Sequence, residues 1–438
     1  MTEKQTKFKE TKIGEIPEEW EVKPIGEVVE IVGGGTPSTA NPKYWNEDIP
    51  WITPKDLSTL KFRYIKRGMR NITKKGIENS SAKLLPRGTV LLTTRAPVGY
   101  LAIAENEVTT NQGFRSLIPN DKTTSEFLFY LLKRNVEILK SNAGGTTFGE
   151  LSGSRLKELK FPFPPLPEQR AIAKILSDLD AKIELNQQIN KILEEIGRAV
   201  FKHWFVDFEF QNEEGESYKS SGGEMVYNEE LEKEIPKGWR AGKLSDYFDF
   251  LEGPGIRNWQ YANEGMRFIN IRLIQGGDID ISSANFINQK DVDEKYQHFL
   301  LKEKDYILST SGTLGRGAIV RKDHLPLLLN TSVIRFQPLD GKGYPFMYEY
   351  LKSDIFLNEQ KILASGSVQN NFGPTHLKRM KLLLPPSEIL NIFNDNMDKL
   401  YEKFTKNLEE NNTLKSIRDS LLPKLVSGKI RVPLEGEE

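Results

Sequence analysis

The first part of the chain carries cationic side chains interleaved with aromatic ones, the residue types that bind nucleic acid. Between residues 49 and 98 there are eleven Lys and Arg against two acidic residues, with Trp51, Phe62 and Tyr64 among them. Lysine and arginine neutralise phosphates, whereas arginine, asparagine, glutamine, serine and threonine in loops read base edges. A run of charges also suits a plain solvated face, so the pattern alone leaves both interpretations open. The residues predicted here to contact DNA are Lys55, Arg63, Lys66, Arg67, Arg70, Lys74, Lys75, Thr94 and Arg95.

A second, less one-sided group of candidate contacts follows after residue 250. It comprises an R-N-W-Q-Y segment, an S-T-S-G-T-L-G-R loop and a Q-N-N stretch, although Ser/Thr/Gly loops are also common as simple turns. The residues predicted to contact DNA in this group are Arg257, Asn258, Gln260, Arg272, Ser309, Ser311, Thr313, Arg316, Gln369 and Asn370.

Three motifs suggest enzymatic chemistry, but each lacks something that the chemistry needs. Residues 41–44, N-P-K-Y, differ by one residue from the N-P-P-Y pattern with which amino-methyltransferases grip a flipped base. The glycines of residues 33–35 follow an apolar stretch but match neither G-x-G-x-x-G nor G-x-x-x-x-G-K-[ST]. Glu18 and Glu21 hint at a nuclease metal site, yet the corresponding segment near Arg240 lacks the acids. The four histidines show no ligand spacing, so we predict neither a catalytic nor a metal site.

Composition limits the class of protein. The 438 residues allow several domains, and 61 basic residues balance 61 acidic ones, so any DNA binding must come from local patches and not from net charge. The chain has no cysteine, no apolar run long enough to span a bilayer and a polar start unlike a signal peptide. These features predict a cytoplasmic protein without a membrane partner.

The second half of the chain repeats the first at an offset of roughly 220 residues. An Ile-Pro pair followed by tryptophan occurs at residues 16–20 and again at residues 235–239. Residues 84–94 align without a gap with residues 300–310, in a pattern typical of a turn followed by a strand. The sequence therefore predicts two similar globular units of the α+β class.

A long amphipathic helix is predicted after each Pro-Pro pair, over residues 168 to about 203 and 387 to about 422. Each apolar stripe is interrupted by two asparagines, Asn186 and Asn190 in one helix and Asn407 and Asn411 in the other. Buried asparagines usually fix register. If the helices pair as an antiparallel coiled coil, as a pseudo-twofold between the halves predicts, Asn186 faces Asn411 and Asn190 faces Asn407. In the alternative, each helix packs only on its own globular domain.

Other segments carry a resemblance to a known family. They are I-P-W-I at residues 49–52, P-P-L-P-E-Q-R-A-I at 164–172, W-F-V-D-F at 204–208 and L-L-P-K-L-V-S-G-K-I at 421–430. With the repeat, they make the chain similar to the specificity (S) subunit of type I restriction-modification systems. The second helix departs from the first, because it opens with P-P-S-E-I and has no W-F-V-D-F ending.

The resemblance implies a division of labour. Two target-recognition domains, residues 1–165 and 233–386, would each read one half of a bipartite site on double-stranded DNA. Helices at residues 166–210 and 387–438 would act as ruler and scaffold. Between the halves, residues 211–232 are rich in Glu, Ser and Gly without apolar periodicity, which predicts a flexible acidic linker. Two methylation subunits would carry S-adenosylmethionine and contact Trp204, Phe205 and Phe208, and restriction subunits would use ATP and Mg²⁺. This chain would be non-catalytic and hold no cofactor. A two-headed protein-interaction scaffold without sequence-specific DNA binding is the alternative.

Overall fold

The computed structural model describes residues 7–144, 149–310, 314–364 and 372–433. The chain divides into two compact units, and both long helices contribute to each of them. Unit 1 comprises residues 1–185 and 411–438, and unit 2 comprises residues 186–410. The long helices are α6 (Leu166–Phe205) and α11 (Ser387–Leu425), so both predicted helices are confirmed and each extends slightly beyond its expected end.

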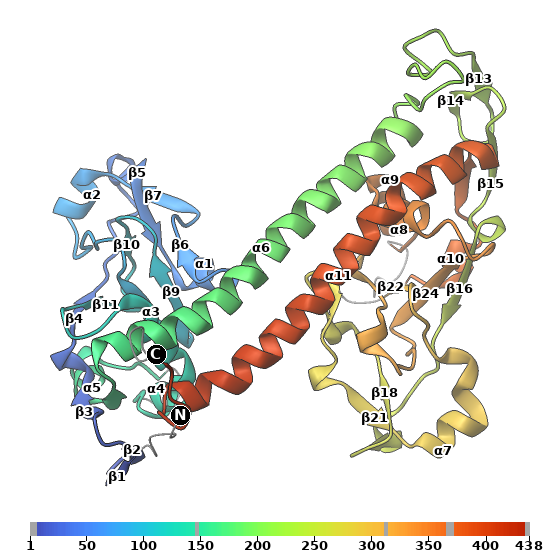
Figure 1. Cartoon of the computed structure of the whole chain (residues 1–438). Helices are drawn as coiled ribbons and strands as arrows, with labels where there is room; N and C mark the ends of the chain where they lie inside the picture. The colour runs from blue at the N-terminus through green and yellow to red at the C-terminus, as the bar shows by residue number, and fades with distance from the viewer. Residues whose placement is uncertain (1–6, 145–148, 311–313, 365–371, 434–438) are drawn as a thin grey trace. The chain divides into compact units, whose positions relative to one another are not determined.

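Unit 1 is built on a five-stranded sheet in the order β4-β11-β8-β9-β6, with a three-stranded sheet β10-β5-β7 beside it in the fold (Figure 1). Strand β8 is buried at all five positions, as its L-L-T-T sequence predicts for a strand covered on both faces. The strands are β1 (Phe8–Thr11), β2 (Gly14–Pro17), β3 (Glu21–Pro24), β4 (Val29–Gly33), β5 (Trp45–Ile52), β6 (Tyr64–Ile65), β7 (Arg70–Ile72), β8 (Val90–Thr94), β9 (Val98–Ala104), β10 (Thr109–Thr110), β11 (Phe114–Pro119) and β12 (Lys160–Phe163). The short helices are α1 (Pro54–Ser58), α2 (Lys74–Glu78), α3 (Ser125–Arg134), α4 (Val136–Ser141) and α5 (Gly153–Glu158), with 3-10 turns at Ile25–Glu27 and Pro42–Tyr44.

Unit 2 repeats this plan. Its main sheet, β16-β24-β22-β23, has the strand order of β4-β11-β8-β9, and β15 pairs with β25 as β3 pairs with β12. The strands are β13 (Met225–Asn228), β14 (Lys233–Pro236), β15 (Arg240–Lys243), β16 (Phe248–Glu252), β17 (Tyr261–Ala262), β18 (Met266–Phe268), β19 (Ile274–Gln275), β20 (Asp278–Ile279), β21 (Asn285–Ile287), β22 (Tyr306–Ser309), β23 (Gly317–Ile319), β24 (Val333–Pro338) and β25 (Lys381–Leu384). The helices are α7 (Gln289–Asp291), α8 (Tyr344–Lys352), α9 (Asp354–Ala364) and α10 (Pro374–Leu377), with a π-helical turn at Val292–Tyr296 and 3-10 turns at Leu244–Asp246, Asn258–Gln260, Ile271–Leu273, Ile281–Ser283, Gln297–Phe299 and Lys322–His324. The predicted internal repeat is confirmed.

Each globular domain shares its core with segments of both long helices. In unit 1, Ile172 and Leu176 of α6 and Leu425 of α11 join one buried cluster with Trp20 and Phe127. In unit 2, α11 and the second segment of α6 supply Phe393 and Phe201 to the core that surrounds Phe346. Most of each apolar stripe is therefore covered by the globular domain and the other helix of the unit in which that segment lies, whereas Ile196 and Ile417 stay 44% and 41% exposed.

The prediction that the acidic linker at residues 211–232 is flexible was wrong, because the segment is folded within unit 2. Strand β13 pairs with β14, and the Phe210 ring stacks on Tyr218 at 4.6 Å and on Trp239 at 5.2 Å between centroids. The polar residues of the segment stabilise turns. For example, Asn212 Oδ1 accepts the backbone N–H groups of Glu214 and Glu216. A few aromatic anchors thus order a segment that lacks apolar periodicity.

Within the part of the chain that the structure describes, no helix is both long and apolar enough to cross a membrane.

Candidate nucleic-acid interface

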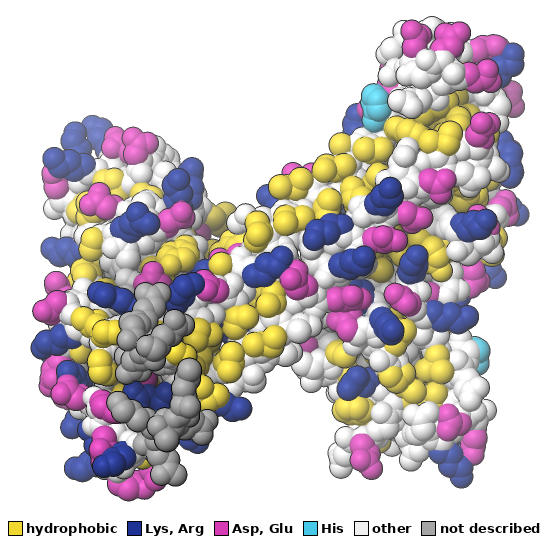
Figure 2. Space-filling model, viewed as in Figure 1, with side chains coloured by type: hydrophobic (Ala, Val, Ile, Leu, Met, Phe, Trp, Pro, Cys, Tyr) yellow, Lys and Arg dark blue, Asp and Glu magenta, His cyan; other side chains and the backbone are white. Residues whose placement is uncertain are grey.

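Unit 1 presents a cluster of exposed cations, which we call the basic patch. Figure 2 shows Lys and Arg side chains gathered on the body that contains α2, β5 and β7 in Figure 1. These elements, with α1 and the loop before β7, carry the side chains of the patch. The patch consists of Lys55, Lys66, Arg67, Arg70, Lys74 and Lys75, all of them exposed.

The loop that carries Lys66 and Arg67 is fixed in place. Asp56 on α1 accepts the backbone N–H of Met69 at 2.9 Å, and it also accepts the backbone N–H of Thr53 at 2.8 Å. A Cβ on Gly68 would lie 2.8 Å from the Asp56 carboxylate, so the loop fits closely against α1 only with glycine there. The backbone beside Lys66 and Arg67 is therefore held against α1, which lowers the entropy lost when these two cations bind phosphates.

Arg70 is positioned by aromatic rings. Its guanidinium carbon lies 3.6 Å from the centroid of Trp45 and 5.7 Å from that of Trp51. The two indoles meet edge to face at 5.0 Å and donate to the carbonyls of Ser38 and Gly35. Stacking orients the Arg70 side chain while leaving it exposed, as a phosphate or base contact requires.

Two of the DNA contacts predicted in unit 1, Arg63 and Thr94, are corrected to structural residues because their side chains are buried. Arg63 is only 8% exposed and bonds to Glu184 of α6, with its Nε 3.2 Å from Oε1, and to the Tyr130 hydroxyl at 3.4 Å. Burial alone would lower the pKa of the Arg63 guanidinium, but Glu184 and Tyr130 raise it by more than burial lowers it, so the charge is retained inside the unit. Thr94 is fully buried in β8, and its backbone N–H donates to Gly113.

Removal of the Arg63 side chain tests its structural role. We expect Arg63→Ala to lower the free energy of unfolding by about 2–3 kcal/mol, because Glu184 and Tyr130 lose a buried partner. Thermal denaturation measures the loss. The exposed neighbour Lys66 provides the control, since Lys66→Ala should change stability by less than about 0.5 kcal/mol. Equal effects of the two substitutions would contradict the buried role.

Arg95, the remaining prediction in unit 1, is half-buried. Its guanidinium lies 3.8 Å from the Glu150 carboxylate, which Arg115 approaches to 3.2 Å. Arg95 thus shares its anion with a second arginine and keeps part of its side chain at the surface.

In unit 2 the predicted contacts separate into exposed and structural residues. Arg257, Asn258 and Arg316 are exposed. Arg272 is exposed but held, because its guanidinium donates to the Ser283 carbonyl at 2.7 Å and to Asn285 at 2.8 Å. Gln260 is half-buried and donates to the Tyr296 hydroxyl. Ser309 is buried, and its Oγ accepts the Arg316 backbone N–H. The other predicted contacts, Ser311, Thr313, Gln369 and Asn370, lie outside the described residues. The prediction for Ser309 is therefore corrected to a structural role.

Trp259 lies within the predicted R-N-W-Q-Y segment, although it is not among the individual residues predicted to contact DNA. It lies between Asn258 and Gln260 in a 3-10 turn, and its side chain is 83% exposed. Indole faces stack on nucleic-acid bases, and a tryptophan surrounded by R-N and Q-Y is unlike a core position. The polar neighbours were the available signal in the sequence.

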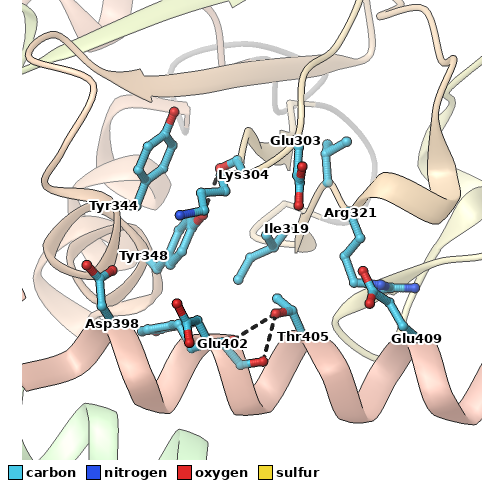
Figure 3. Close-up of a pocket in the computed structure, with 12 residues that line it drawn as sticks. Glu303, Lys304, Ile319, Arg321, Tyr344, Tyr348, Asp398, Glu402, Thr405 and Glu409 are labelled. Atoms are coloured by element: carbon cyan, nitrogen blue, oxygen red, sulfur yellow. Dashed lines mark hydrogen bonds between the residues drawn. The ribbon is translucent and has the colours of Figure 1, made fainter.

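A pocket in unit 2 is unsuited to phosphate. Figure 3 shows Tyr344 and Tyr348 on one side and Glu402 and Thr405 of α11 on the other. Four carboxylates and two cations line it, namely Glu303, Asp398, Glu402 and Glu409 with Lys304 and Arg321. Arg321 is buried and paired with Asp278 and Asp323, so the accessible charge is mainly acidic. This pocket would repel a nucleic-acid backbone.

The N-P-K-Y motif at residues 41–44 has a local structural role. Asn41 caps a 3-10 turn, and its Oδ1 accepts the Lys43 backbone N–H at 3.1 Å. Among residues 7–144, 149–310, 314–364 and 372–433, no group of three or more His, Cys, Asp or Glu could hold a metal ion.

The buried asparagines join α6 and α11. In unit 2, Asn407 Nδ2 donates to Asn190 Oδ1 at 2.8 Å, and Asn190 Nδ2 donates to the Phe404 carbonyl at 3.1 Å. Asn186 donates to Glu410 Oε2 at 2.8 Å. Residue numbers rise on one helix as they fall on the other, so these segments run antiparallel. The predicted Asn186–Asn411 pairing stays a prediction, because Asn411 belongs to unit 1.

The W-F-V-D-F segment lies mainly in the core. Phe205 and Phe208 are 5% and 6% exposed, and their rings lie 5.9 and 5.5 Å from that of Trp239. The prediction that these two residues contact a partner subunit was wrong, because unit 2 itself covers them. Trp204 is half-buried, with its ring 5.8 Å from Phe393.

The comparisons with known proteins cover nearly the whole chain. Residues 17–195 and 236–416 both match the family described as type I restriction modification DNA specificity domain. The MjaIX type I restriction enzyme specificity subunit of Methanocaldococcus jannaschii is 42% identical, with 98% of this chain and 97% of that protein covered. The HindI specificity subunit of Haemophilus influenzae is 26% identical, with 81% and 89% covered.

A solved structure shares the fold. The S subunit of a type I restriction-modification system from M. genitalium superposes with a TM-score of 0.56 at 20% identity, covering 93% of this chain and 96% of that one. Two copies of the specificity domain, each of which includes most of a long helix, account for both the repeat and the matches. The chain belongs to the family of type I restriction modification DNA specificity proteins.

Proposed function

We propose that this chain is the DNA sequence-specificity subunit of a type I restriction-modification complex. The observation that carries the proposal is the twofold occurrence of one specificity domain, each joined to a long helix, along a chain 42% identical to a named specificity subunit. Residues 1–165 and 233–386 act as the two target-recognition domains, and each reads one half of a bipartite site.

The long helices serve as ruler and scaffold. We infer that α6 and α11 form an antiparallel coiled coil with a pseudo-twofold between the halves. The Asn190–Asn407 hydrogen bond in unit 2 and the shared strand order of the two sheets support this inference.

Catalysis belongs to other subunits of the complex. Two methylation subunits bind S-adenosylmethionine and modify adenine, and restriction subunits use ATP and Mg²⁺. This chain recognises the target sequence, in the cytoplasm. The names of the relatives, which are specificity subunits of restriction enzymes, support the placement of target recognition in this chain and of catalysis in other subunits.

Selection from a random double-stranded DNA library tests the proposal. The chain, co-purified with its methylation subunit, should retain DNA that carries two short sequence blocks at a fixed separation. Retention of DNA with a single block would contradict the role of the second domain. Retention of no DNA at any salt concentration would favour a protein-interaction scaffold.

Charge reversal in the basic patch tests its role in DNA binding. We expect Lys66→Glu with Arg67→Glu to weaken binding about tenfold or more and to reduce the slope of log affinity against log salt by about 1–2, because phosphate contacts are lost. Arg70 is left unchanged, since it also packs on Trp45. Fluorescence anisotropy with a selected duplex measures both quantities.

The control for this test is the pair Lys399→Glu and Lys403→Glu, which makes the same change of charge on the exposed face of α11. If the patch variant kept the wild-type slope, the patch would not contact phosphates.

A further inference from the structure

One helix of each globular domain occupies the same place in the repeat. Helix α3 follows strand β11 and contains L-F-Y-L-L-K, whereas α8 follows strand β24 and contains M-Y-E-Y-L-K. Strands β11 and β24 hold matching positions in the two main sheets. Alignment of the two segments places Tyr130 of α3 opposite Glu349 of α8 in the repeat.

The amino-acid sequences of the two long helices can be aligned over their full length. The stripe that matches Ile172 with Phe393 also matches Asp180 with Tyr401 and Gly197 with Arg418. In both aligned pairs the residue type differs between the helices. A carboxylate in α6 corresponds to a phenol in α11, and a glycine in α6 corresponds to an arginine in α11.

In unit 1 the globular domain supplies the tyrosine. The Tyr130 hydroxyl donates to Asp180 Oδ2 at 2.8 Å, and Arg418 Nη1 donates to Asp180 Oδ1 at 2.6 Å. Tyr130 is fully buried and Asp180 is 4% exposed. The bond therefore joins α3 to α6 in a place from which water is excluded.

In unit 2 the long helix supplies the tyrosine. The Tyr401 hydroxyl of α11 donates to Glu349 Oε1 of α8 at 2.6 Å, and both residues are buried. A Cβ on Gly197 would lie 2.1 Å from that same oxygen, so glycine at this point of α6 leaves room for the carboxylate. Burial raises the pKa of Glu349, while Lys352 and the bond from Tyr401 oppose the shift.

We propose that each globular domain is matched to its own helical seat by a tyrosine–carboxylate hydrogen bond whose donor and acceptor are exchanged between the units. The tyrosine belongs to the domain in unit 1 and to the helix in unit 2. If the two domains exchanged places, Glu349 of the second domain would face Asp180 of α6. Tyr130 of the first domain would face Tyr401 of α11. Two buried carboxylates repel each other, and two phenols leave the charge-assisted bond unmade. Under the proposed function, this matching fixes which half-site each end of the subunit reads.

The central test uses a full-length chain in which residues 1–165 and 233–386 have exchanged places. Tyr130→Glu together with Glu349→Tyr should raise the thermal midpoint of this exchanged chain by about 5 °C. The same pair should lower that of the native chain by a smaller amount, because Arg63, whose guanidinium lies 3.4 Å from the Tyr130 hydroxyl, offsets part of the repulsion between Asp180 and a carboxylate at position 130. The same two substitutions thus act with opposite signs in the two orders. A change of the same sign in both chains, or no change in either, would overturn the proposal.

A cycle within the native chain answers the question even if the exchanged chain does not fold. Glu349→Tyr alone and Tyr401→Asp alone should each lower the thermal midpoint, whereas the double variant, which has the tyrosine–carboxylate arrangement of unit 1, should recover at least half of the summed loss. Strictly additive losses would overturn the proposal. Both measurements are made without DNA, so their outcome is independent of sequence recognition.

Discussion

Replacement of Phe205 by alanine is expected to lower the free energy of unfolding of unit 2 by about 3–5 kcal/mol, the usual loss for a buried aromatic ring. The ring lies 4.9 Å from those of Phe346 and Phe393 and 5.1 Å from that of Phe201, between centroids. The globular domain and both long helices therefore lose one shared packing centre. Denaturant titration followed by near-ultraviolet circular dichroism measures the loss, because Trp204 and Trp239 pack in the same cluster and contribute to that signal.

Val206 provides the matched control. It is the next residue, its side chain is 39% exposed, and Val206→Ala should cost less than about 1 kcal/mol. The two variants also separate the structural role of the segment from a partner contact. If Phe205→Ala unfolded like the wild type but failed to co-purify with the methylation subunit, the W-F-V-D-F segment would be an interface after all.

The burial of the Phe205 side chain could not be predicted from the sequence. A run of aromatics at the end of a helix looks the same whether a partner or the chain itself covers it. Its covering residues, Phe346 and Phe393, lie far along the sequence, and no periodicity within α6 indicates them. The helix itself was predictable, because its apolar stripe and the preceding prolines are local signals.

The basic patch shows the same division. Charge counting finds the cationic surface but gives Arg63 the same weight as Lys66. Only the fold places Glu184, on the long helix, beside the Arg63 guanidinium. The polar segment at residues 211–232 was predicted to be flexible for a related reason. A few aromatic contacts, which the composition does not indicate, suffice to order it. The repeat and the exposed cations were thus predictable, whereas the choice between binding and structural arginines required tertiary contacts.

Lengthening both long helices tests the ruler, and it has the most far-reaching expected effect. Units 1 and 2 divide α6 between Leu185 and Asn186, and they divide α11 between Glu410 and Asn411. Insertion of four helix-forming residues at both boundaries leaves the contacts within each unit in register. At 1.5 Å per residue the helices gain about 6 Å, so the gap between the selected half-sites should widen by about 2 base pairs at 3.4 Å each.

A single insertion provides the contrasting case. Four residues added directly after Asn190, in α6 alone, displace Asn186 and Asn190 from Glu410 and Asn407 while residues 191–205 stay packed in unit 2. Buried amides then lose their partners, which costs about 1–3 kcal/mol for each unsatisfied group, and assembly with the methylation subunit should fail. DNA selection with the doubly lengthened chain gives the decisive result, because half-sites at an unchanged separation would mean that the helices do not measure the distance between them.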